Sequence, residues 1–286
     1  MNYINSILVL AGIYLVLSSS FDLIIGYGGL ISIAHPIFYA IGAYTAGLLA
    51  IVWHVPAIPA ILSGGVLAAV ASVAMSLPAI RVAGDYLLIA SIGFQLGLLQ
   101  IIKNVEFTGG DAGLSDIPPA ITGPSRAALF AAISLSLGVL VVLLIRWIVR
   151  GPYGAIITAM RDDELALLAL GRNVTRIKVV ILAVGSGLAG LAGGIYAFYY
   201  QYLSPSQFDV LQSAAILTMV VIGGMGTALG PVIGTFLLLG LPQAITFLQL
   251  PPSVMAPFQG ILFCVLVLLF ILVRPQGIIA ARRPHT

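Results

Sequence analysis

The chain has very little charge. Asp, Glu, Lys and Arg make up 7% of its 286 residues, whereas hydrophobic residues make up 60% and the mean hydropathy is +1.16. A soluble domain carries about 25% charged residues. The composition therefore excludes a water-exposed globular surface and predicts an integral membrane protein. At about 20 residues per transmembrane helix, the chain has room for roughly ten spans joined by short loops.

The residues used for most site chemistry are also scarce. The single cysteine, Cys264, lies in an apolar run, so no disulfide forms within the chain. The only lysines, Lys103 and Lys178, lack the glycine spacing of a phosphate loop. No metal-ligating cluster or nucleophile motif is found, so we expect neither cofactor nor catalysis. The net charge of +3 does not indicate nucleic-acid binding. No basic segment precedes the first apolar run, so residues 4–17 are expected to be a retained span rather than a signal peptide.

Apolar runs and their breaks predict an all-α polytopic bundle forming a single transmembrane domain over residues 1–286. About ten segments are expected, at 4–20, 23–34, 37–53, 57–77, 86–103, 127–149, 177–200, 213–225, 229–249 and 257–273. Segments 23–34 and 213–225 would reach only about 20 Å as helices. They are too short to cross about 30 Å of hydrocarbon, so we expect two short broken helices.

Each short segment runs into a glycine-rich turn. Irregular backbone at membrane depth is tolerated only beside protein or a water-filled cavity. Paired interrupted segments therefore point to a translocation site. The candidate path or gate residues are Gly26, Gly28, Gly29, His35, Gln95, Gly223, Gly224 and Gly226. The alternatives are close helix packing for the glycines, capping of helix carbonyls for His35, and interhelical hydrogen bonding for Gln95, which we expect beside Gln100.

Ionisable side chains are expected only at the ends of segments, as for Asp22, Asp85 and Asp209. Ion-coupled carriers usually keep such a residue inside the bundle. The pattern therefore favours a permease driven by another subunit over a self-contained secondary carrier, which remains the alternative of a different class.

Basic residues predict the orientation. With ten segments, ten of the 12 Lys and Arg residues share one face, and only Lys103 and Arg126 lie on the other. The positive-inside rule places the first face in the cytoplasm. Residues 150–178, the tail after Arg274 and both termini are thus expected inside, with 104–126 and 201–212 outside.

The cytoplasmic loop 150–178 contains a compact charged helix and turn, with Gly171 as its expected left-handed terminator. So short a helix is marginal alone in water. We therefore expect its leucines to be buried against another surface, which is either the membrane surface or a groove of a separate ATPase. The candidate coupling residues are Arg161, Asp162, Asp163, Glu164, Leu165, Leu168, Gly171 and Asn173.

The sequence resembles the permease subunits of branched-chain amino-acid ABC importers, and most closely the M-type member of the Liv-type H/M pair. The resemblance lies in Gly26-Tyr27-Gly28-Gly29 through Thr45, Gly84-Asp85-Tyr86 through Pro119, Arg161-Asp162-Asp163-Glu164 through Gly194, and Val221 through Pro231. The general importer loop pattern is matched only approximately, because Glu164 lies one residue too far from Gly171.

The resemblance implies a type II-like importer permease in a bacterial or archaeal cell membrane, which is the inner membrane in a Gram-negative cell. It implies an H-type partner permease, two ATPase subunits that bind the ATP, and an extracytoplasmic solute-binding protein. The spans lack fixed charge for an ion, which favours a small neutral or zwitterionic substrate. A branched-chain amino acid is expected; urea or a short amide is the alternative.

Overall fold

The computed structural model describes residues 2–79, 85–246, 265 and 277–279 of the chain. The elements are α1 (Asn2–Asp22), a π-helical turn η1 (Leu23–Tyr27), α2 (His35–Val52), α3 (Ala57–Ala79), α4 (Asp85–Asn104), 3-10 turns η2 (Glu106–Thr108) and η3 (Gly110–Ala112), α5 (Arg126–Arg150), α6 (Pro152–Asp162), α7 (Glu164–Ala169), α8 (Val174–Tyr200), a 3-10 turn η4 (Pro205–Phe208), α9 (Val210–Gly223) and α10 (Gly230–Thr246).

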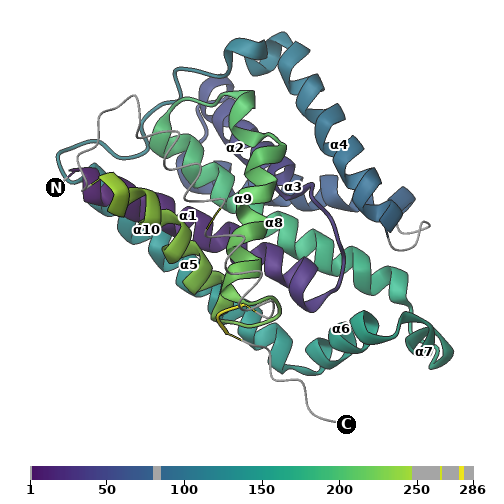
Figure 1. Cartoon of the computed structure of the whole chain (residues 1–286). Helices are drawn as coiled ribbons and strands as arrows, with labels where there is room; N and C mark the ends of the chain where they lie inside the picture. The colour runs from purple at the N-terminus through teal and green to yellow at the C-terminus, as the bar shows by residue number, and fades with distance from the viewer. Residues whose placement is uncertain (1, 80–84, 247–264, 266–276, 280–286) are drawn as a thin grey trace.

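The described part of the chain confirms an all-α polytopic membrane protein. Seven helical segments in it are long and apolar enough to cross a membrane, and residues 230–240 form a shorter apolar helix. Most helices pack into one bundle, while α4 stands at its edge and α6 and α7 project from one end (Figure 1). The expected segment 257–273 and Cys264 lie outside the described residues, apart from Val265.

The expected break between segments 4–20 and 23–34 is wrong. Residues 3–27 form one continuous span, because α1 runs directly into the π-helical turn. The Gly28 N–H bonds to the Leu23 carbonyl at 3.1 Å, and the helix ends there. Gly29, with φ +64°, turns the chain away. The second short segment, expected at 213–225, lies mostly in α9, which has 14 residues. With η4 it forms a longer candidate span, Pro205–Gly223, of 19 residues, so the prediction that it is too short to cross the membrane is wrong.

Because residues 3–27 form one span instead of two, the N-terminus lies at a different end of the bundle from the one predicted. The Tyr199 hydroxyl, near the end of α8, donates to Ser6 Oγ at 2.8 Å, whereas Gly26 at the other end of the span contacts Arg161 of α6. The N-terminus therefore lies at the opposite end of the bundle from residues 150–178, and the prediction that the two share a side is wrong. Basic residues could not reveal this, because no Lys or Arg precedes Arg81.

Small residues set the packing around α8, which lies against α2 and α3. A Cβ on Gly42 would collide with the backbone of Gly190. A Cβ on Gly190 would lie 2.9 Å from the Gly64 carbonyl oxygen. Without a hydrophobic driving force between helices in lipid, such close backbone approach supplies much of the association. The glycines of α8 therefore act in packing.

Gly42→Ala is expected to destabilise the protein. The added methyl meets backbone that has no room to move, and overpacking of this kind lowers the free energy of unfolding by about 1–3 kcal/mol. The matched control is Gly97→Ala in α4, where an added Cβ meets nothing within 4 Å. That change should be neutral or stabilising by up to about 1 kcal/mol. Thermal unfolding of the purified variants in detergent checks the difference; equal melting temperatures would contradict this packing.

Candidate functional site

Two glycine-rich turns meet at the end of the bundle that carries α6. The first glycine turn is residues 26–29, at the end of the span that begins at Tyr3, and the second glycine turn is residues 223–226, at the end of α9. A Cβ on Gly26 would lie 2.5 Å from the backbone nitrogen of Gly226, so the two backbones touch only because Gly26 has no side chain. The structure thus joins two sites that the sequence predicted separately.

A buried carboxylate holds the two turns together. Asp22 is 1% exposed, and its Oδ1 accepts a hydrogen bond from the Gly226 N–H at 2.8 Å. Gly226 has φ +71°, a conformation that L side chains rarely adopt. The expectation that Asp22 sits at the end of a segment is wrong, because this residue lies within the continuous span 3–27.

Arg161 contacts the same junction from α6. Its Nη1 donates to the Gly26 carbonyl at 2.6 Å. The last carbonyls of a helix have no partner within the helix, and the guanidinium supplies one here. A Cβ on Gly29 would lie 2.8 Å from Arg161 Cγ, so the aliphatic stem packs against the first glycine turn. One side chain therefore connects residues 150–178 to the first glycine turn.

The loop carrying Arg161 forms two helices rather than the expected single one. Asp163 has extended backbone and N-caps α7, where its side chain accepts from the Ala166 N–H at 2.9 Å. Asp162 instead ends α6, one residue before this cap. Gly171 has φ +73°, which confirms the left-handed terminator. Asn173 then caps α8 by accepting from the Arg176 N–H at 3.0 Å. We call residues 152–169 the α6–α7 loop.

Most leucines of this loop are exposed in the described part of the chain. Leu167 is 5% exposed and anchors α7, whereas Leu165 is 77% exposed and Leu168 48%. Glu164 contacts α8, because Lys178 Nζ donates to both its carboxylate oxygens at 2.7 and 2.8 Å. An ion pair thus fixes α7 on α8 while an apolar face remains outside.

His35 and Gln95 lie in contacts between helices. The His35 Nε2 is 2.9 Å from Ser20 Oγ, which donates to the Leu17 carbonyl at 3.1 Å. Gln95 is fully buried, donates to the Phe208 carbonyl at 3.3 Å and accepts from the Ser213 hydroxyl at 3.1 Å. Gln100 is exposed, so its expected position beside Gln95 is wrong. Five residues along a helix rotate the side chain by about 140°.

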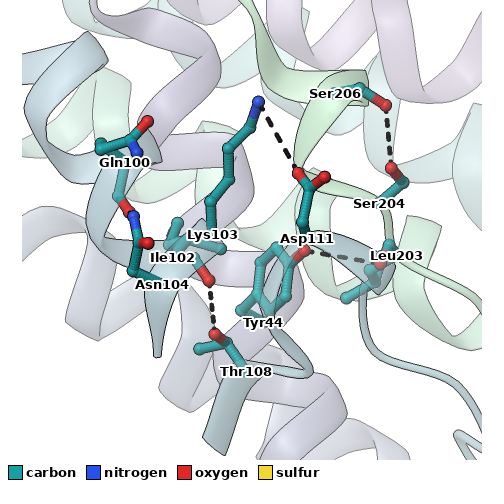
Figure 2. A network of polar contacts seen from close by, with 10 residues as sticks. All are labelled: Tyr44, Gln100, Ile102, Lys103, Asn104, Thr108, Asp111, Leu203, Ser204 and Ser206. Atoms are coloured by element: carbon teal, nitrogen blue, oxygen red, sulfur yellow. Dashed lines mark hydrogen bonds and ion pairs between the residues drawn. The ribbon is translucent and has the colours of Figure 1, made fainter. Parts of the chain in front are cut away.

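The opposite end of the bundle carries an ordered loop over residues 104–126. Leu114 and Leu203 form an antiparallel bridge, and the Tyr44 hydroxyl donates to the Leu203 carbonyl at 3.4 Å. Figure 2 shows this contact beside the ion pair of Lys103 with Asp111, whose atoms are 3.9 Å apart. The loop is thus tied to α2 and to residues 201–204. This order fits both a receptor-docking surface and a simple connection.

The fold and the junction are those of a multi-pass membrane transport protein, with interrupted spans meeting beneath a projecting loop. The family of branched-chain amino acid transport system permease components matches residues 3–271, and the chain belongs to this family. It is therefore a LivM-type ABC importer permease, a membrane component rather than a catalytic subunit.

Individual relatives agree with this assignment. The chain is 30% identical to the high-affinity branched-chain amino acid transport system permease protein LivM of Escherichia coli, over 98% of this chain and 70% of the relative. It is 28% identical to a probable branched-chain amino acid transport permease LivM of Methanocaldococcus jannaschii, over 77% and 67%. An autoinducer 2 import permease, LsrC of Yersinia pseudotuberculosis, is 25% identical over 57% and 47%. No solved structure matches the chain.

Gln95 offers a test of path lining against helix packing. Gln95→Met keeps the volume but leaves the Phe208 carbonyl and the Ser213 hydroxyl without this partner. We expect a loss of about 0.5–2 kcal/mol in stability and unchanged substrate preference. Gln100→Met is the control at an exposed position of the same helix and should have no effect on stability. Thermal unfolding and competition uptake are the measurements. A changed substrate preference at wild-type stability would instead make Gln95 a path residue.

Proposed function

We propose that this chain, as one transmembrane permease domain, forms half of the translocation path of a branched-chain amino-acid importer. An H-type permease supplies the other half, and two separate ATPase subunits drive transport. The observation that carries the proposal is the α6–α7 loop. It presents Leu165 and Leu168 outward, yet it is fixed to the bundle by Arg161 and by the Glu164–Lys178 pair.

The uncovered leucines suit docking into a groove of an ATPase, as an amphipathic helix does. A partner that binds them moves α7, and the two anchors carry that movement to α8 and to the first glycine turn. The membrane-surface alternative covers the leucines equally well. It gives no role to the bond between Arg161 and the first glycine turn.

The secondary-carrier alternative needs a new argument, because Asp22 is an ionisable residue inside a span. The carboxylate of Asp22 already accepts from the Gly226 N–H, so its contact is structural. Membership of the ABC permease family and the exposed face of α7 now favour the driven permease.

For the substrate, we propose a branched-chain amino acid. Two LivM relatives carry that activity in their names, while the more distant LsrC relative is named for a different solute. A zwitterion fits a path lined by backbone at two helix breaks, because helix ends offer partial charges of both signs. Urea or a short amide remains the alternative within the same class.

We propose that the end of the bundle carrying the α6–α7 loop faces the cytoplasm. Arg146, Arg150, Arg161, Arg172 and Arg176 belong to this end, while Lys103 and Arg126 lie at the other. Ile278 bonds to the Ile222 carbonyl at 2.9 Å, which brings residues 277–279 to the inner end as well. The N-terminus is then outside, together with residues 104–126 and 201–212, where the solute-binding protein docks.

Leu168→Asp tests the proposal. A charge buried in the groove without a partner costs several kcal/mol, so we expect at least a tenfold loss of co-purified ATPase and of uptake. Leu168 is half exposed, so the level of the chain in the membrane and its melting temperature should be unchanged. Leu168→Met is the matched control, because it conserves volume and polarity and should behave as wild type. Normal ATPase binding and uptake in Leu168→Asp would favour the membrane-surface alternative.

A further inference from the structure

We propose that Asp22 and Arg161 are positioning residues that make the two glycine turns and the α6–α7 loop one mechanical unit. Through this unit a movement of α7 reaches both breaks in the membrane spans. The inference rests on the proposed docking of an ATPase at α7 and adds the route by which docking acts on the path.

The route consists of two hydrogen bonds that meet at adjacent backbone groups. Arg161 bonds to the carbonyl of Gly26, and Asp22 bonds to the amide of Gly226. The backbones of Gly26 and Gly226 are themselves in contact. The Arg161 bond joins residues 135 positions apart in the chain, and the Asp22 bond joins residues 204 positions apart. The two bonds meet at the contact between Gly26 and Gly226.

The charge on Arg161 makes its bond strong, because a hydrogen bond with one ionised partner is roughly twice as strong as a neutral one. Asp22 is 1% exposed, so water does not compete for its bond to Gly226. No ion pair joins Asp22 to Arg161 among the salt bridges of the described residues. Each side chain bonds to a backbone group instead, so both side chains hold turns rather than each other.

The glycines allow this close contact and restrict the movement of the glycine turns relative to the α6–α7 loop. A Cβ on Gly226 would lie 3.2 Å from both Arg161 Nη1 and the Gly26 carbonyl oxygen. A Cβ on Gly29 would lie 2.8 Å from Arg161 Cγ. A side chain at Gly29 or Gly226 would separate the turns from the α6–α7 loop. Direct contact between backbone and guanidinium leaves little room for the loop to move independently.

A second contact fixes the α6–α7 loop to a different part of the bundle. Glu164 and Lys178 connect α7 to the start of α8 and do not touch the glycine turns. Loss of the Arg161 bond therefore leaves α7 held on α8 and available for docking. Only the connection to the glycine turns is removed. Arg161 variants should thus bind ATPase and hydrolyse ATP, but fail to convert hydrolysis into transport.

The experiment uses the complete importer in proteoliposomes, with its binding protein, and measures ATP hydrolysis and leucine uptake on the same samples. For Arg161→Gln we expect ATPase co-purification at the wild-type level, hydrolysis within about twofold of wild type, and at least a tenfold fall in leucine transported per ATP. Asp22→Leu should show the same uncoupling. The double variant should be no worse than either single one, because residues in one unit are not additive.

Arg150→Gln is the matched control. Arg150 is exposed at the end of α5, on the same end of the bundle, and should keep the wild-type ratio of transport to hydrolysis. Arg161→Lys keeps the charge but presents a shorter, single donor group, so it should reach the membrane normally with an intermediate ratio. This variant decides the matter if Arg161→Gln does not fold.

The outcomes separate the inference from the proposed function. A wild-type ratio in Arg161→Gln, or in Arg161→Lys if only that variant folds, overturns the inference. Loss of ATPase binding in a folded Arg161 variant also overturns it, because Arg161 would then be a docking residue. If no ATPase associates with the wild-type chain, or leucine uptake does not depend on it, the proposed function itself fails.

Discussion

The hydrogen bond between the Asp22 carboxylate and the Gly226 amide is the constraint on which the rest of the site depends. An ionisable group within a membrane span is costly unless it is paired, and Asp22 is 1% exposed. Its partner can approach only if Gly26 and Gly226 both lack side chains. The end of the first span, the interruption between α9 and α10, and the glycines at both places are therefore consequences of one contact.

Around this contact the bundle has two unlike ends. One end is closed by an ordered loop that is tied to α2 and to the residues after α8 (Figure 2). The other presents the α6–α7 loop, with apolar residues facing outward and two polar anchors facing in. A permease driven from outside the membrane needs such a division, because one end meets the energy source and the other meets the solute. Membership of the ABC importer permease family agrees with this difference between the two ends of the bundle.

The sequence predicted features that depend on local chemistry. Gly171 was expected in a left-handed conformation and has it, and the all-α membrane fold followed from composition. Features set by distant contacts were missed. Asp22 was assigned to the end of a segment because its partner lies 204 residues away. The sequence analysis split one span in two and therefore placed the N-terminus at the same end of the bundle as residues 150–178, whereas it lies at the other end. The break at Asp163 was missed because a run of acidic residues suits a first turn as well as a cap.

The most direct test of the account is a distance between spin labels in the assembled importer. One label is placed at Ala169, at the end of α7, and the other at Met225, which is exposed in the second glycine turn. If the α6–α7 loop and the glycine turns move as one unit, this distance is the same without nucleotide and in the ATP-trapped state. The distance from Ala169 to Asn104, at the end of α4, changes between those states. A distance from Ala169 to Met225 that depends on nucleotide in the wild-type complex would contradict the account.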